Sequence, residues 1–578
     1  MVKNLKKRGQ NFVKRFSRAS IKASEEGKEH IKENLLQRIS HIQNIRLLIF
    51  EWSLLVLALI MLAATQSIWF NNSYAGDVFV DGGSYTEATI GKVNSMNPLF
   101  ATTNSEKVLS KLMFATITEV DYSGNPGLGL VQSLRAEENG KVWKIKLRDN
   151  LKWSDGEPLT NEDVLFTLGL IQNPAVKSVF DSNLENVKIS ENENGEIVFS
   201  LPAAYADFAT ALEIPVVPKH KLENAPAKNL IEDDFSNTPV TSGAFAFNAL
   251  QSTSKEDEEV VYLTANPNYY LGRPMINSFA IHTYQDKNEV VDAMNRGAVT
   301  ATAELSGLDA DRINSTTFLK KDSGIAAGVF MFFNTTRGAL KNVDLRAAIR
   351  SGIDLSAVRE AAPNTIALNY PFIDSQIQLT NYPQIPGYNL DESRNTINNI
   401  SGEEHLRLNI VTVNSGYLPA VAESVETQLE ALGIEVNITA YEETQDFIAN
   451  IISKRNYDIL IYEVELGADP DPLPYYHSSQ ASTAGLNLSY YSNALVDDLL
   501  VAARETLDPA LRAKKYESFL EHWVNDVPAI GLYQANLTYI YNKNARAYGN
   551  DVRLVTAIDR FSDILNFATV KANRNKTP

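Results

Sequence analysis

The sequence predicts an α/β protein of several lobes that follows one transmembrane helix. Three observations support this prediction. The 578 residues exceed what one compact core holds. A long apolar segment stands near the N-terminus, and hydrophobic repeats of strand and helix period alternate through the rest of the chain. Hydrophobic residues make up 44% of the chain, so buried cores are expected despite a formal net charge of −17.

The apolar segment covers residues 47–70, LLIFEWSLLVLALIMLAATQSIWF. As a helix it would be about 36 Å long, which exceeds the ~30 Å hydrocarbon core of a bilayer. Trp52 and Trp69 lie near its two ends, where aromatic rings favour the membrane interface. We expect one transmembrane helix here, followed by a short linker at residues 71–84.

Charge divides unevenly on the two sides of this segment. Residues 1–46 carry 12 Lys and Arg against 4 Asp and Glu, and the chain from residue 52 onward carries 41 basic against 65 acidic residues. Since an excess of Lys and Arg stays cytoplasmic, we expect residues 1–46 inside the cell and a C-terminal ectodomain outside. A cleaved signal peptide is the alternative, because Ser73-Tyr74-Ala75 offers small residues for cleavage. The long charged lead favours an uncleaved, single-pass anchor in the cell membrane.

The sequence lacks the residue patterns of the common catalytic and metal-binding sites. The chain has no cysteine, which excludes disulfides, thiol catalysis and a lipid-modified N-terminal cysteine. Its seven histidines show no metal-binding spacing, and no nucleophile elbow, P-loop or GxGxxG motif occurs. The acidic ectodomain has no basic stripe for nucleic acid. We expect a binding protein, not an enzyme, with no cofactor, metal or nucleic-acid partner.

Local patterns predict several elements of the first half. Residues 141–147, KVWKIKL, alternate apolar and polar side chains as a half-buried strand does. A turn follows at residues 154–156, Ser-Asp-Gly. Thr160 and Asp163 then form the pattern of a capping box, which predicts a helix over residues 161–172.

The second half contains a predicted βαβ crossover. Residues 406–413 and 434–441 have strand character, and residues 418–432 between them place apolar side chains every three or four positions. Gly433 supplies the left-handed residue that ends such a helix. A further strand at residues 457–464 is almost wholly apolar, as strands covered on both faces are. Open α/β sheets of this type bind ligands beyond the carboxyl ends of their strands.

Seven segments of the chain carry a resemblance to a known family. The most recognisable is KVWKIKLRDNLKWSDGEPLTNEDVLFTL at residues 141–168. The others are residues 94–134, 241–247, 266–279, 329–358, 457–480 and 491–533. In this order they resemble the bacterial extracellular solute-binding proteins of family 5, the group that includes the oligopeptide- and dipeptide-binding proteins. The resemblance covers roughly residues 85–570.

The resemblance implies a periplasmic-binding-protein fold of type II, with two α/β lobes, a hinge and an extra subdomain. Lobe I is expected at residues 85–285, with the subdomain inserted at about 111–205. Lobe II is expected at residues 286–530, and residues 531–578 return to lobe I. Two strand crossovers would act as the hinge, and closure would bury the ligand between the lobes.

The resemblance also implies a carboxylate that binds the ligand's α-amine, because a buried ammonium needs a compensating charge. This carboxylate falls in GADPDP, where Asp469 is the first candidate and Asp471 the second. The Gly-Trp that precedes this loop in well-known peptide binders is replaced by Glu465-Leu466. The alternative is an Asp-Pro-Asp-Pro turn whose carboxylates cap local N–H groups.

Two further places are candidate ligand contacts. The backbone around Thr102, Thr103 and Asn104 corresponds to the edge that pairs with peptide in relatives, and the alternative is a surface loop. Asn334, after an apolar strand, either lines the cleft or caps a helix.

The resemblance predicts the substrate-binding protein of an ABC transporter, which captures peptides for import. Its partners would be a peptide ligand, the permease subunits with their ATPases, and the membrane, and the protein would be a monomer. Two alternatives stay open. The first is import of another solute, such as an oligosaccharide, an opine-like compound or a metal chelate. The second is a membrane-tethered peptide sensor or chaperone that feeds no transporter.

Overall fold

The computed structural model describes Lys28 and residues 37–120, 126–252, 258–373, 376–377, 379–402, 405–442 and 445–575. Most of the predicted cytoplasmic segment lies outside the described residues. The chain divides into two compact units. The first consists of residues 1–78 and 571–578, and the second of residues 79–570.

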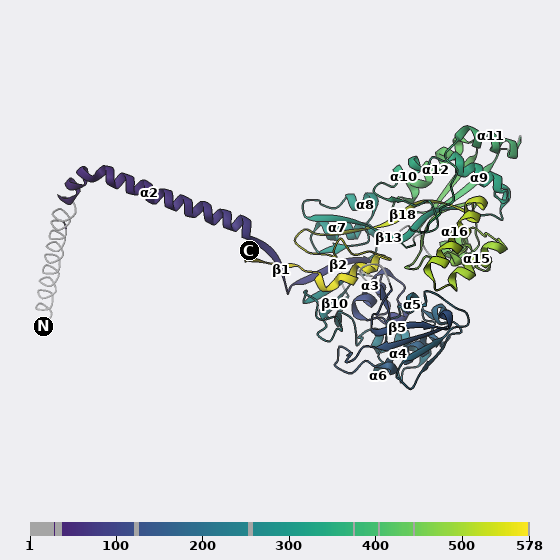
Figure 1. Cartoon of the computed structure of the whole chain (residues 1–578), viewed down its shortest axis with the longest axis horizontal. Helices are drawn as coiled ribbons and strands as arrows, with labels where there is room; N and C mark the ends of the chain where they lie inside the picture. The colour runs from purple at the N-terminus through teal and green to yellow at the C-terminus, as the bar shows by residue number, and fades with distance from the viewer. Residues whose placement is uncertain are drawn as a thin grey trace, which may run out of the picture. The chain divides into compact units, whose positions relative to one another are not determined.

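The described part of the first unit is dominated by the helix α2, Gln37–Tyr74 (Figure 1). No Pro or Gly interrupts this stretch of the sequence, so nothing breaks the helix. Within it, Phe50–Ile68 is long and apolar enough to cross a membrane, and none of it is buried. The strand β1, Ala75–Val80, follows directly and pairs with the last strand, β19, Val570–Asn575. The expected linker at residues 71–84 is thus largely regular structure.

The second unit is built on one long mixed sheet. Its strands lie in the order β16-β15-β17-β13-β18-β12-β2-β11-β10-β9, and β14 also pairs with β18. Their bounds in that order are β16 Glu435–Tyr441, β15 Arg407–Val413, β17 Ile459–Glu465, β13 Phe318–Phe333, β18 Ala529–Asn542, β12 Ala301–Thr302, β2 Ser84–Ile90, β11 Ser278–Tyr284, β10 Glu259–Ala265, β9 Phe245–Ser252 and β14 Ile366–Ala367.

Two separate hydrophobic cores divide this sheet into two lobes. One core contains the apolar side chains of β15 and β17, together with β13 from Ala326 onward and β18 up to Tyr533. The other contains side chains of β2, β10 and β11, together with Leu537 and Tyr539 of β18. The strands β13 and β18 therefore pass from one lobe into the other. The predicted fold class, two α/β lobes joined by crossover strands, is confirmed.

The first lobe carries a four-stranded antiparallel sheet of its own, with the order β5-β6-β8-β7 (Val131–Glu137, Val142–Leu147, Ile197–Ser200 and Lys188–Glu191). The strand predicted at residues 141–147 is β6. The predicted capping box is present at Thr160 and Asp163, and it opens α4, Asn161–Ile171. These local patterns were sufficient to predict the strand and the helix from the sequence, because each pattern depends on neighbours within a few residues.

The predicted crossover of the second lobe is also confirmed. The strands β15 and β16 are parallel, and α12, Leu418–Ala431, connects them. Gly433 follows the helix with a φ of +86°, the left-handed conformation that favours glycine. The strand predicted at residues 457–464 is β17.

The remaining helices lie on and around these sheets, and most of them are labelled in Figure 1. They are α3 Asn104–Met113, α5 Phe208–Ala211, α6 Lys219–Leu222, α7 Lys287–Asn295, α8 Gly307–Asp311, α9 Val343–Gly352, α10 Leu355–Glu360, α11 Leu390–Ser401, α13 Gln445–Phe447, α14 Leu473–Tyr476, α15 Ala494–Arg504 and α16 Pro509–Asp526.

The boundary between the lobes differs from the one expected at residue 286. The strand β12 pairs with β2 of the first lobe. The side chains of α7 pack in a small cluster with Ala88 of β2 and Ile540 of β18. Apart from Val120, the buried residues of the second lobe's core start at Ala326. Residues 286–324 thus pack with the first lobe, because their apolar faces cover its sheet.

Candidate functional site

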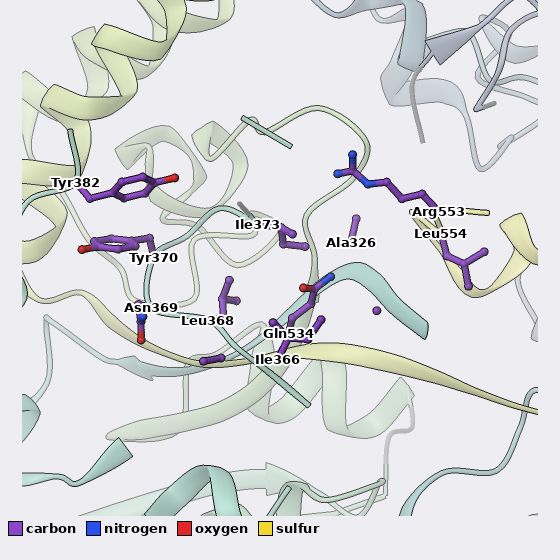
Figure 2. Close-up of a pocket in the computed structure, with 12 residues that line it drawn as sticks. Ala326, Ile366, Leu368, Asn369, Tyr370, Ile373, Tyr382, Gln534, Arg553 and Leu554 are labelled. Carbon is purple, nitrogen blue, oxygen red and sulfur yellow. The ribbon is translucent and has the colours of Figure 1, made fainter. Parts of the chain in front are cut away.

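A cavity of about 540 Å³ lies beside the strands that connect the two lobes (Figure 2). This volume is in the range of small-molecule sites. Its twelve lining residues come from β13, β18, the segment from β14 to Ile373, the loop that carries Tyr382, and the segment before Val555. They are Gly324, Ala326, Ile366, Ala367, Leu368, Asn369, Tyr370, Ile373, Tyr382, Gln534, Arg553 and Leu554.

The cavity sits where the ladder between β13 and β18 is irregular. Gly324 pairs with Asn536, and the next regular pair joins Gly328 to Gln534. The two hydrophobic cores also meet at this point, since Ala326 belongs to the second lobe and Leu554 to the first. A break in a ladder between two rigid lobes is where backbone bending is cheapest. The cavity therefore lies at the hinge, between the lobes.

Residues 366–373 form a segment that closes the cavity from the second lobe, and Arg359 of α10 holds it in place. Arg359 donates from Nε to the Leu532 carbonyl (2.6 Å) and from Nη2 to Asn369 Oδ1 (2.7 Å). The segment lies close to β18 because residue 531 is glycine. A Cβ at Gly531 would lie 2.7 Å from the Leu368 carbonyl oxygen, so any larger residue would push the segment away.

Two tyrosines form an aromatic wall on the same side. The rings of Tyr370 and Tyr382 lie with centroids 4.9 Å apart at an interplanar angle of 43°. The Tyr370 hydroxyl donates to the Pro383 carbonyl (2.8 Å), which fixes the ring. Figure 2 shows Arg553 reaching over the cavity from the opposite side.

Arg553 is the one charged residue among the twelve that line the cavity. It is partly buried, and burial lowers the pKa of its guanidinium. Its neighbour Leu554 is buried in the core of the first lobe. The Val555 carbonyl accepts a hydrogen bond from the Ala326 N–H (2.8 Å), so the backbone at Arg553 is fixed beside the hinge.

The predicted amine-binding carboxylates lie in the loop after β17. The loop starts at the cavity wall, because the Leu466 N–H donates to the Ala326 carbonyl (2.7 Å). Asp469 then pairs with Arg512 of α16, and Asp471 with Arg504 of α15, whose Nε lies 2.7 Å from Asp471 Oδ2. Each carboxylate side chain is 10% exposed.

The structure therefore brings Asp469 and Asp471 together with two arginines of their own lobe, and neither residue lines the cavity. Asp471 Oδ1 also accepts from the Leu473 N–H (3.1 Å), which is the local capping role given as the alternative. Burial raises the pKa of Asp469 to about 6, although the charge of Arg512 opposes that shift.

Thr102, Thr103 and Asn104 lie at the start of α3 in the first lobe. The backbone N–H groups of Thr102 and Thr103 both donate to the Glu106 carboxylate, at 2.8 and 3.0 Å, and Thr103 caps the helix. Asn104 Nδ2 donates to Glu304 Oε2 (3.1 Å). These groups serve the helix start, and none of the three residues lines the cavity.

Asn334 is buried directly after the end of β13 and does not line the cavity either. Its Nδ2 donates to the carbonyls of Arg455 (3.1 Å) and Tyr457 (3.2 Å), and its Oδ1 accepts from the Thr336 hydroxyl (2.9 Å). The residue that caps α9 is Asn342. Asn334 thus ties three chain segments together.

Sequence reasoning missed Tyr370, Tyr382 and Arg553. All three come from segments outside regular helices and strands, where no periodic pattern marks a facing direction. One signal was present: the tripeptide Asn-Tyr-Pro occurs twice, at residues 369–371 and 381–383. Both tyrosines stand in these repeats, next to prolines that restrict the backbone.

Residues 125–487, more than half of the chain, match the model of the bacterial extracellular solute-binding proteins, family 5. The chain belongs to this family. This family 5 protein is also 24% identical to the oligopeptide-binding protein AppA of Bacillus subtilis, over 86% of its own length and 94% of the relative.

Solved structures share the fold of this family 5 protein. The structure of Bacillus subtilis AppA in complex with a nonapeptide has a TM-score of 0.67 and 22% identity, and the match covers 84% of this chain and 99% of that one. CtaP of Listeria monocytogenes has a TM-score of 0.75 and 21% identity, over 85% and 100%. NikZ of Campylobacter jejuni, in complex with Ni(L-His), has a TM-score of 0.70 and 21% identity, over 84% and 99%.

Proposed function

We propose that this protein captures peptides in the cavity between its lobes and delivers them to an ABC importer. The observation that carries the proposal is the position of the cavity at the break between Gly324 and Gly328, where the lobes meet. A ligand bound there contacts both lobes, so its binding energy favours the closed form. The oligopeptide-binding relative supports a peptide as the ligand.

The lining suits a peptide of varied sequence. Apolar side chains such as Ile366, Leu368 and Ile373 bury the ligand's carbon atoms, and Asn369 and Gln534 offer amide groups for its backbone. The volume of about 540 Å³ accommodates a short peptide and ordered water. Because water can fill the space around ligand side chains of different size, the cavity does not require one particular ligand side chain.

The proposal places α2 across the cell membrane with its basic N-terminal side in the cytoplasm. The apolar stretch Phe50–Ile68 and the charge difference between the two sides support this orientation. The binding unit would then stand outside the cell as a tethered monomer beside the permease subunits. Tethering keeps its concentration near the permease high even when the free solute is dilute.

Mass spectrometry tests the proposed ligand. The full-length chain would be purified in detergent and unfolded, and the released small molecules would be identified. We expect defined short peptides, because a closed cavity releases its ligand slowly. If a folded chain releases no peptide and binds none from di- to nonapeptide libraries in equilibrium dialysis, peptide capture is refuted. Release of a sugar or a metal chelate would assign a different solute.

A further inference from the structure

A second cavity, of about 100 Å³, lies at the junction of the lobes, and the carboxylates Asp322 and Glu463 are among the residues that line it. We call it the acidic cavity, and the larger one the hinge cavity. On the side of the first lobe, the Thr538 hydroxyl of β18 donates to Asp322 Oδ1 of β13 (2.6 Å). Glu463 of β17, Tyr417 and Tyr533 come from the second lobe. A ligand in the acidic cavity would therefore contact both lobes.

The two cavities adjoin along two segments of the chain. On β18, Gln534 lines the hinge cavity, and its neighbours Tyr533 and Ala535 line the acidic cavity. Ile366 pairs with Gln534 at the hinge cavity, as Figure 2 shows, whereas Thr365 lines the acidic cavity. A peptide whose chain lies in the hinge cavity can thus extend one long side chain into the acidic cavity.

The lining of the acidic cavity offers hydrogen-bond acceptors and no positive charge. None of its fourteen described residues is Lys, Arg or His. Asn536, which also lines it, donates from Nδ2 to the Asn364 carbonyl (2.6 Å), and this bond fixes the orientation of the amide. Asn536 Oδ1 is then shielded from solvent and accepts no hydrogen bond from any described residue. A buried acceptor without a donor is costly, so the cavity suits a ligand that brings N–H groups.

Two tyrosines show that the potential in this cavity is negative. Burial, and then the charges of Asp311 and Asp322, raise the pKa of Tyr417. Burial, and then the charge of Glu463, raise the pKa of Tyr533. Surroundings that disfavour a phenolate favour a cation in the same place.

The cation that fits is organic. Among the described residues no group of three or more His, Asp or Glu side chains could hold a metal ion. A volume of about 100 Å³ has room for the head of one side chain and little else. A guanidinium carries five N–H donors and an ammonium three, so either can face carboxylates on two sides. Both stand at the end of long apolar stems that can lie along an apolar lining.

We propose that the acidic cavity receives an arginine or lysine side chain of a peptide whose chain lies in the hinge cavity. This inference rests on the proposed peptide function and specifies the class of peptide: one with a basic residue. The cation would lie between Asp322 of the first lobe and Glu463 of the second, and Asn536 Oδ1 would accept a further N–H. Two carboxylates on opposite lobes repel each other on closure, so a cation between them favours the closed form.

Three matched tetrapeptide libraries test this inference on the full-length chain in detergent, at about 150 mM salt to screen distant charges. The first has only uncharged side chains, the second has one arginine, and the third has citrulline, which is uncharged and similar in shape, in place of that arginine. Each is prepared with a free and with an acetylated N-terminus. Equilibrium dialysis with mass spectrometry measures the affinities.

Three variants accompany the wild type. Asp322→Asn and Glu463→Gln each remove one carboxylate from the acidic cavity and keep the size of the side chain. The control, Asp391→Asn, removes one carboxylate from a side chain of α11 that is 90% exposed, so the net charge changes equally. Circular dichroism of each variant establishes that the chain is folded.

We expect the wild type to bind the arginine library about 10-fold more tightly than the citrulline library, with either N-terminus, because citrulline loses a charged hydrogen bond. Asp322→Asn and Glu463→Gln should each reduce this preference to about 3-fold or less and leave the affinity for citrulline peptides unchanged. Asp391→Asn should keep the full preference.

Equal binding of arginine and citrulline peptides by the wild type would overturn the role of the acidic cavity while peptide capture stood. An unchanged preference in both cavity variants would overturn it as well, as would an equal loss of both libraries, which indicates damage to the site. If acetylation weakened binding and Asp322→Asn removed that effect, the cavity would hold the terminal amine, and the side-chain assignment would be wrong. Failure of a folded wild type to bind any library would overturn the proposed peptide function itself.

Discussion

Glu87 and Arg560 form a buried ion pair in the first lobe. Glu87 is 0% exposed and Arg560 2% exposed, and Arg560 Nε lies 3.1 Å from Glu87 Oε1. The Tyr539 hydroxyl donates to the other carboxylate oxygen (2.9 Å) and lies 2.9 Å from the Tyr85 hydroxyl. Burial opposes the charge of Arg560, but the Glu87 carboxylate outweighs this, so the pKa of Arg560 is raised.

Replacement of Glu87 by Gln should destabilise the first lobe strongly, because it leaves a buried guanidinium without its counter-charge. We expect a loss of about 3–5 kcal/mol in the free energy of unfolding, measured by urea denaturation. The matched control is Glu435→Gln, whose partner Arg407 is 76% exposed. That change should cost at most about 1 kcal/mol. Similar losses in the two variants would contradict the structural role of the buried pair.

The role of the candidate carboxylates could not be assigned from the sequence alone. Asp469 and Asp471 stand among prolines, and nothing nearby in the chain reveals their partners. Those partners lie 43 and 33 residues away, on α16 and α15. An aspartate's role depends on which charge the fold places beside it, and only the tertiary structure supplies that.

The end of α15 in the second lobe meets the segment before α5 of the first lobe. The Ala206 N–H donates to the Arg504 carbonyl (2.8 Å), and the Arg504 guanidinium lies 5.4 Å from the centre of the Tyr205 ring. Burial, and then the charge of Asp469, raise the pKa of Asp207 to about 7. We call this contact the rim cluster; it comprises Tyr205, Asp207, Asp469, Asp471, Arg504, Arg512 and Tyr516.

The rim cluster should make closure sensitive to pH. In an open form Asp207 would face water, with a pKa near its ordinary value of 3.8. The raised pKa in the closed form means that closure takes up a proton between about pH 4 and 7. Closure is therefore favoured below this window and penalised as the pH rises through 7.

Peptide affinity should accordingly be higher at pH 5.5 than at pH 8, as measured by equilibrium dialysis. Asp207→Asn has no ionisable carboxyl at this position, so its affinity should depend less on pH than that of the wild type. Subtracting the pH dependence of the variant's affinity from that of the wild type cancels the contribution from titration of the peptide itself. If the variant kept the pH dependence of the wild type, the rim cluster would not be its source.

Elements defined by local patterns were predictable, and those defined by distant pairing were not. The strand β6, the capped helix α4 and the crossover through α12 each follow from side chains within one short segment. The strand β13 contains Gly324 and Gly328, which in a sequence suggest an interruption. Its pairing with β18 is irregular between these two glycines and resumes at Gly328, because two cores hold the ends of the strand.

At the scale of the whole molecule, the lobes also touch on the face where Ser306 lies opposite Gly416. A Cβ on Gly416 would lie 3.3 Å from the Ser306 hydroxyl, and one on Gly307 would lie 3.2 Å from the Tyr417 ring. Gly307 is next to the first lobe's sheet, whereas Tyr417 packs against the second core. A bulky side chain at this point would hold the lobes apart.

Ser306→Trp should therefore weaken peptide binding and abolish the compaction that closure causes. Small-angle scattering, with and without a library of short peptides, measures the change in radius of gyration. Ser190→Trp, on an exposed position of β7, is the control and should compact as the wild type does. Normal compaction in Ser306→Trp would show that closure does not bring these surfaces together.

The path of β18 through both lobes determines when each lobe can finish folding during synthesis. This strand and the segment that carries Arg560 leave the ribosome hundreds of residues after Glu87, which depends on them. The first lobe must therefore wait for these residues while the second lobe is already emerging. A chain stopped short of β18 would lack the strand that both cores share. Both lobes, not one, would then remain incompletely folded.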